Sequence, residues 1–339
     1  MYRPNGTNEM LWVFPRCHPL VFNRNQIRWI PYAQRSLQLG YSGVDFSSHE
    51  NDIALPEEVM SLAVPPYASM LLDEAARSSN AALEFVKNKN IALLGTSLDR
   101  RAMETFCIGQ PGTETFKKSA HTYSWCRFPD LNLTIQMWFQ FGLSQDTVWP
   151  GDDQAEREPP RVLEDRIEHV YKPLSREHTG PPDLIILGST IWDLAYYSYQ
   201  TSLNSGRTQH QALTLKSARR PITWQFLAWH RKRLQEVAQL LQKEFPSASL
   251  MLRLGTYDAK AANRTQNAVI FQMNHSTESA ARHLGIPIFT WSTLLVGESD
   301  YAPDDLHYST NGRANWLYGN MLLHYLKAHT AHTGRTSFC

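Results

Sequence analysis

Four short apolar runs stand out along the chain, and each is typical of a strand that is buried on both faces. They are residues 91–95, 184–188, 250–255 and 286–289. A continuous apolar run bounded by glycine or proline predicts a strand of a parallel sheet, because helices cover both faces of such a strand. Residues 131–141 predict one more strand, which we expect nearer an edge because its first positions alternate between apolar and polar.

Helical spacing of apolar positions fills the segments between these runs. The pattern predicts helices within residues 65–90, 224–241, 270–284 and 314–325. Gly285 directly after the third of them is a typical C-terminal stop signal. Strands that alternate with helices predict an α/β fold with a doubly wound parallel sheet.

The same pattern divides the chain into one large α/β domain and two flanking segments. We expect the domain at residues 66–330, after an irregular extension at 1–65 and before a tail at 331–339. Two further segments, 144–182 and 199–221, are rich in proline or in polar residues and show no clear period. Two interpretations of them stay open: substrate lids, or disordered insertions.

Charge and cysteine content narrow the class of protein. The chain has 33 Lys plus Arg and 32 Asp plus Glu, so nothing in its net charge indicates binding to nucleic acid or to an anionic membrane. No apolar run approaches the ~20 residues needed to cross a bilayer. The cysteines lack metal-ligand spacing, and the N-terminus lacks the order of a signal peptide. We therefore expect a soluble cytoplasmic protein with free thiols, no metal and no cofactor, whose oligomeric state stays open. The cysteines are Cys17, Cys107, Cys126 and Cys339.

Candidate chemistry follows the first apolar run, at the sheet edge where ligands of parallel sheets bind. The run ends in Gly95, and Thr96 and Ser97 come next. A serine at a strand-to-helix turn can hold its hydroxyl toward a cleft while its own N–H faces a developing oxyanion. Taken alone, however, the segment favours a simpler interpretation in which Thr96 or Ser97 only caps the next helix.

A second motif near the C-terminus changes that balance. Asp304 stands three residues before His307, directly before the last predicted helix. A carboxylate at this spacing can accept a hydrogen bond from the imidazole and so leave its other nitrogen to deprotonate a serine. Asp305 is an adjacent competitor, but the spacing favours Asp304. We expect His307 to lie within hydrogen-bond reach of both Ser97 and Asp304.

These motifs resemble the SGNH hydrolases, and within them the PC-esterase branch that includes plant polysaccharide O-acetyltransferases. The matches of the first and last blocks are Gly95, Ser97, Arg100, Asp304, His307 and Tyr308. Residues 131–141 are similar to the aromatic second block, and 183–194, with Trp192, are similar to the third. The resemblance covers roughly residues 90–328 in the right order, and it implies a Ser-His-Asp triad and an oxyanion hole.

The chain departs from the family at two positions. Thr96 stands where the family has Asp, and Gly188 stands where the family has an Asn that donates to the oxyanion. Ser189 and Thr190 are the candidates to replace that donor, beside the N–H groups of Ser97 and Gly142. If the donor is missing, Gly188→Asn should raise activity on an activated ester, unless the new side chain clashes.

The favoured function is a serine esterase or O-acyltransferase that acts on a small-molecule or glycan ester. One alternative is an isomerase or cyclase that uses Asp304 and His307 for proton transfer, and another is a catalytically dead binding protein. Arg100 is expected to stabilise the turn. Trp192, Trp138 and Phe139 are candidate pocket walls, with a core role at least as plausible for each.

Overall fold

The computed structural model describes most of the predicted α/β domain. The described residues are 72, 74–77, 81–110, 112–146, 158–206, 222–256, 264–295, 307–309 and 312–332. The predicted extension at 1–65, the tail beyond residue 332 and Asp304 lie outside these ranges.

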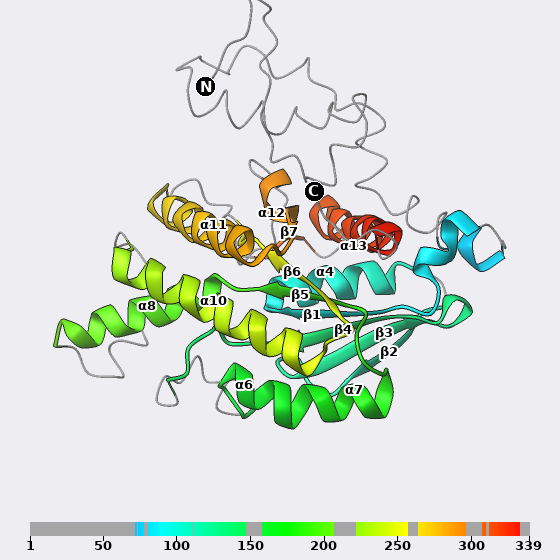
Figure 1. The fold of residues 1–339 in the computed structure, drawn as a ribbon, viewed down its shortest axis with the longest axis horizontal. Helices are drawn as coiled ribbons and strands as arrows, with labels where there is room; N and C mark the ends of the chain where they lie inside the picture. The colour runs from blue at the N-terminus through cyan, green and yellow to red at the C-terminus, as the bar shows by residue number, and fades with distance from the viewer. Residues whose placement is uncertain are drawn as a thin grey trace, which may run out of the picture.

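A seven-stranded sheet forms the centre of the fold, in the order β2-β3-β4-β1-β5-β6-β7 (Figure 1). The strands are β1 (Asn90–Gly95), β2 (Glu114–Lys117), β3 (Tyr123–Phe128), β4 (Leu133–Phe139), β5 (Leu184–Gly188), β6 (Ser249–Arg253) and β7 (Ile288–Phe289). The five neighbouring strands β4, β1, β5, β6 and β7 run parallel, which confirms the predicted α/β fold and its parallel sheet. Strands β2 and β3 add an antiparallel edge that the sequence pattern did not predict.

Helices cover both faces of the sheet. The longer ones are α4 (Ser97–Ile108), α8 (Ile191–Asn204), α10 (Trp224–Glu244), α11 (Arg264–Leu284) and α13 (Arg313–His332). The shorter ones are η4 (Ala81–Val86), η5 (Pro129–Leu131), α6 (Leu163–Arg166), the π-helical η6 (Ile167–Tyr171), α7 (Lys172–His178) and α12 (Trp291–Leu294). Figure 1 shows α4 and α13 on one face, and α6, α7 and α10 on the other.

Alternate residues of β1 supply the two cores that hold these layers together. Ile91 and Leu93 pack in the core beneath α4 and α13, whereas Ala92 and Leu94 pack in the core shared with α6, η6 and α10. All four side chains are buried, so both faces of β1 are covered. This burial explains why the strand is apolar at every position instead of every second one.

Two sequence-based expectations about this domain are wrong in the described part. Residues 131–141 were expected near an edge, but β4 pairs with both β3 and β1. Residues 158–182 do not form a loose lid, because α6, η6 and α7 place Leu163, Ile167 and Tyr171 in the core. Likewise α8 continues to Asn204 and so includes the beginning of the segment 199–221.

The prediction of free thiols is also wrong for two of the four cysteines. Cys107 of α4 and Cys126 of β3 form a disulfide whose Cα atoms are 6.2 Å apart. Both side chains are buried. Their separation of 19 residues has no spacing signature, so only the packing of α4 on the sheet brings them together. Cys17 and Cys339 lie outside the described residues.

Candidate active site

The turn that presents Ser97 is built by its neighbours Thr96 and Asp99. Thr96 is the N-cap of α4, and its N–H donates to Asp99 Oδ2 at 2.8 Å. The Thr96 hydroxyl in turn accepts from the Leu98 N–H at 3.4 Å. Because these groups form the cap, the hydroxyl of Ser97 is not needed for capping. Thr96 is therefore the cap, and Ser97 stays a candidate nucleophile.

His307 approaches this turn from the segment that precedes α13. Its Nε2 lies 2.7 Å from Ser97 Oγ, and both side chains are part-buried. The next residue, Tyr308, is buried with its ring edge-on to Trp291, and the Trp291 indole donates to the Ala314 carbonyl at 2.8 Å. These contacts anchor the backbone beside His307 to α12 and α13. The place of Asp304 stays a prediction, because it lies outside the described residues.

The two backbone N–H groups expected at an oxyanion hole, those of Ser97 and Gly142, differ in whether they already donate a hydrogen bond. No group in the described part of the chain accepts a hydrogen bond from the Ser97 N–H. The Gly142 N–H, in contrast, donates to Gln140 Oε1 at 2.5 Å. Gln140 also spans the strand ends, since its N–H donates to the Gly95 carbonyl at 2.9 Å and its side-chain amide donates to the Gly188 carbonyl. Ser97 is thus the available donor of the pair.

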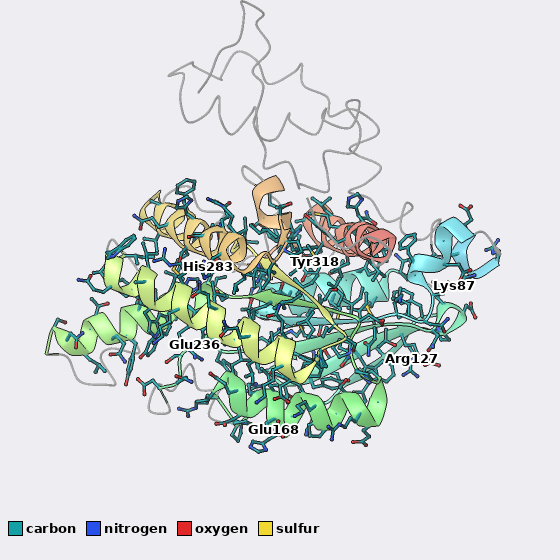
Figure 2. The ribbon with its side chains drawn as sticks, in the orientation of Figure 1. Lys87, Arg127, Glu168, Glu236, His283 and Tyr318 are labelled. Atoms are coloured by element: carbon teal, nitrogen blue, oxygen red, sulfur yellow. A yellow bond between two sulfur atoms is a disulfide. The ribbon has the colours of Figure 1, made fainter. Side chains whose placement is uncertain are left out.

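An arginine occupies the space beside Gly188. A Cβ atom at Gly188 would lie 2.6 Å from Nε of Arg253, which is closer than real Cβ contacts allow. Arg253 extends from the end of β6 and ion-pairs with Asp99, with Nε 2.6 Å from Oδ1. Tyr318 of α13, labelled in Figure 2, donates to the same Oδ1 at 2.9 Å. Sequence reasoning missed all three of these residues.

The residues after β5 face inward, away from solvent. Ser189 Oγ lies 2.8 Å from His230 Nε2, and both are buried. Thr190 has φ 125° and a buried hydroxyl that has no hydrogen-bond partner in the described part of the chain. This hydroxyl packs against Gly255, where a Cβ would lie 2.6 Å from it. Of the two candidate replacement donors, the Ser189 hydroxyl therefore already contacts His230, and the Thr190 hydroxyl is enclosed beside Gly255.

Asp193 repeats at β5 the capping arrangement of Asp99 at β1. Its Oδ1 accepts from the Leu143 N–H at 2.7 Å and its Oδ2 from the Thr190 N–H at 3.1 Å. Burial raises the pKa of Asp193 to about 6, although these hydrogen bonds oppose the shift. Burial lowers the pKa of His230 to about 3, so this imidazole is neutral at pH 7.

The remaining predicted side chains divide between core and surface. Arg100 donates to the Ala120 carbonyl at 2.5 Å, and burial lowers its pKa. Trp138 is fully buried and stacks on Tyr171 with ring centroids 5.2 Å apart. Phe139 is buried as well, so neither aromatic lines an open surface. Trp192 is partly exposed and meets Phe141 edge-on at 5.2 Å.

No group of three His, Cys, Asp or Glu side chains among the described residues is placed to hold a metal ion. None of the helices that the structure describes is both long and apolar enough to span a membrane.

Comparison with known proteins gives matches among solved structures alone. No protein-family model and no curated protein match the chain. A GDSL-like lipase from Bacteroides thetaiotaomicron is 12% identical with a TM-score of 0.39, over 79% of this chain and 99% of the other. An acetylxylan esterase from Geobacillus stearothermophilus is 12% identical with a TM-score of 0.39, over 72% and 96%. A carbohydrate esterase family 2 enzyme from Myceliophthora fergusii is 15% identical with a TM-score of 0.40, over 72% and 67%.

Proposed function

We propose that the protein is an acyl-transferring serine enzyme in which Ser97 is the nucleophile and His307 the general base. One observation carries this proposal: Nε2 of His307 lies 2.7 Å from Oγ of Ser97, although 210 residues separate them. A part-buried serine hydroxyl that contacts an imidazole at a strand-to-helix turn is the arrangement that nucleophilic acyl transfer needs. Asp304 is proposed to orient His307.

The chemistry follows from the position of Ser97 at the start of α4. His307 takes the hydroxyl proton while Ser97 Oγ attacks the ester carbonyl, and the carbonyl oxygen becomes an oxyanion. The N–H of Ser97, which has no acceptor among the described residues, and the positive end of the α4 dipole stabilise that charge. His307 then protonates the departing alkoxide, which leaves an acyl-serine. Water or an acceptor hydroxyl attacks this ester and regenerates Ser97.

The substrate class in this proposal is an ester of a small molecule or a glycan. Hydrolysis and transfer share every step up to the acyl-serine and differ only in the group that resolves it. The partly exposed Trp192 is proposed to contribute to the substrate pocket.

Covalent labelling with a fluorophosphonate tests the nucleophile directly. Wild-type protein should be labelled at Ser97, as located by peptide mass spectrometry, and Ser97→Ala and His307→Ala should lose the label. Ser189→Ala is the matched control, because it removes another serine hydroxyl that contacts a histidine at 2.8 Å, but in a fully buried pair. This variant should keep the label.

Turnover separates this proposal from proton-transfer chemistry at the same residues. Ser97→Ala should lower the rate by several orders of magnitude, because members of a triad act as a unit. If Ser97→Ala keeps more than about a hundredth of the wild-type rate while Asp304→Ala is more harmful, an isomerase or cyclase would replace the esterase proposal.

A further inference from the structure

A fully buried ion pair lies directly beneath the turn that carries Ser97. Asp99 and Arg253 are each about 2% exposed. Arg253 contacts both carboxylate oxygens of Asp99, with Nε 2.6 Å from Oδ1 and Nη2 2.7 Å from Oδ2. The Tyr318 hydroxyl donates to Oδ1 at 2.9 Å, and the Thr96 N–H donates to Oδ2 at 2.8 Å. Three elements, α4, β6 and α13, therefore meet at one carboxylate.

The glycines at two strand ends make room for this cluster. A Cβ at Gly95 would lie 2.3 Å from Asp99 Oδ2, and a Cβ at Gly188 would lie 2.6 Å from Arg253 Nε. In the sheet, β5 lies between β1 and β6, so Arg253 must pass the end of β5 to reach Asp99. It can do so because Gly188 has no side chain. The backbone at the sheet edge is thus shaped around the ion pair.

We propose that Asp99, Arg253 and Tyr318 are positioning residues that hold the Ser97 hydroxyl on His307. This inference rests on the proposed function and names the group that keeps its nucleophile in place. The Thr96 N–H is the link between the cluster and the nucleophile, because it fixes the Gly95–Thr96 peptide unit, one residue before Ser97. With Asp99 fixed by Arg253 and Tyr318, the turn has one orientation, and it aims the adjacent N–H of Ser97 at the place of an oxyanion.

A purely stabilising role explains this arrangement poorly. Removing two charges from water costs about as much as their attraction returns, and apolar residues of similar volume often stabilise a fold as well or better. A buried charge pair is favoured where it fixes a unique geometry. This pair fixes the backbone of Thr96, the residue directly before Ser97. A displacement of 1 Å at a reacting group can cost about a hundredfold in rate.

Tyr318→Phe is the variant that tests the proposal, since it removes one hydroxyl from the cluster and leaves the ion pair intact. Asp99→Asn would leave Arg253 buried without its counter-charge, and loss of folding would then hide the effect. Tyr171→Phe is the matched control. Tyr171 is also fully buried, and its hydroxyl accepts from Arg166 Nε at 2.8 Å, but it packs on the opposite face of the sheet.

The deciding measurement is the ring ¹⁵N signal of His307, assigned by its disappearance in His307→Ala. Ser97→Ala defines the signal of an imidazole that has lost the serine hydroxyl. In Tyr318→Phe the signal should move toward that of Ser97→Ala, and in Tyr171→Phe it should stay at the wild-type position. Fluorophosphonate labelling should slow about tenfold in Tyr318→Phe and less than about twofold in Tyr171→Phe.

The outcomes for the two proposals are separable. A His307 signal that does not move in Tyr318→Phe, or that moves equally in Tyr171→Phe, overturns the positioning role. Failure of the wild-type protein to be labelled overturns the proposed function instead, and the His307 signal still decides whether the cluster positions Ser97.

Discussion

Substitution of Gly188 is the sharpest test of how the sheet edge is built. The motif resemblance alone predicts that Gly188→Asn restores an oxyanion donor and raises activity. The structure predicts the opposite, because a Cβ at this position would lie 2.6 Å from Nε, 2.7 Å from Nη2 and 2.9 Å from Cζ of Arg253. These distances are far inside the usual contact between nonbonded atoms, so one of the two residues must move.

The guanidinium has little freedom to move away. Its Nη1 donates to the Leu254 carbonyl at 2.8 Å, while Nε and Nη2 contact Asp99. Overpacking of a dense core costs about 1–3 kcal/mol. Breaking a buried ion pair costs about 3–5 kcal/mol. We therefore expect Gly188→Ala to lower the free energy of unfolding by about 2–4 kcal/mol, between these limits. Gly188→Asn should cost about 1–3 kcal/mol more, because its amide is buried without partners.

Chemical denaturation of the variants and of the wild type measures these costs, and turnover of nitrophenyl acetate measures activity. Gly206→Ala is the control, because Gly206 has φ 81° and open space around it. There an added Cβ brings backbone strain of about 1–2 kcal/mol and no clash. A Gly188→Asn protein that is as stable as wild type within about 0.5 kcal/mol and turns over faster would refute the steric reasoning.

Two further predictions concern the disulfide and the buried carboxyl of α8. The disulfide closes a loop with a sequence separation of 19, so its reduction should lower the free energy of unfolding by about 3 kcal/mol. Denaturation with and without reductant checks this. The stability of a Cys107→Ala/Cys126→Ala chain should not depend on the reductant, and a stability equal to that of oxidised wild type would contradict the prediction. Burial raises the pKa of Asp193 from 3.8 to about 6, so the folded state binds the carboxyl proton more tightly than the unfolded state does. The stability that this protonation contributes therefore falls as the pH rises from about 4 to 6. From pH 7 to pH 5 the wild type should gain about 1 kcal/mol more than Asp193→Asn, and parallel pH profiles of the two proteins would count against the shift.

The parallel part of the sheet could be predicted from the sequence, because a strand that is buried on both faces is apolar at almost every position. Strands β1 and β5 are apolar at nearly every position, and the structure buries every residue of both. The antiparallel edge left no such signature. Strand β2, residues 114–117, is mostly exposed and has a single apolar residue, Phe116, among four, too few for a period to show. Its place is set by pairing with β3, which is tertiary information.

At the candidate active site, the sequence shows the local motifs but not the long-range contacts. Ser97 and His307 each stand in a short pattern that has a chemical meaning by itself. Asp99 also has a local signal in the sequence: Thr96-x-x-Asp99 is a capping-box spacing, and Thr190-x-x-Asp193 repeats it after β5. Arg253 had none, because a single polar residue near the end of an apolar run does not show which strand end its side chain will reach.

The position of Arg253 also changes what the glycine at 188 means. Taken from the sequence, Gly188 is a lost donor and indicates a weakened oxyanion hole. In the fold, a side chain at 188 and the guanidinium of Arg253 compete for the same space, so the two positions are coupled and only one of them can be filled. Gly188 is then the condition that lets Arg253 reach Asp99 beneath Ser97. The same coupling predicts that an asparagine at 188 becomes tolerable only when residue 253 is shortened, and that such a chain must hold the turn of Ser97 by some other contact.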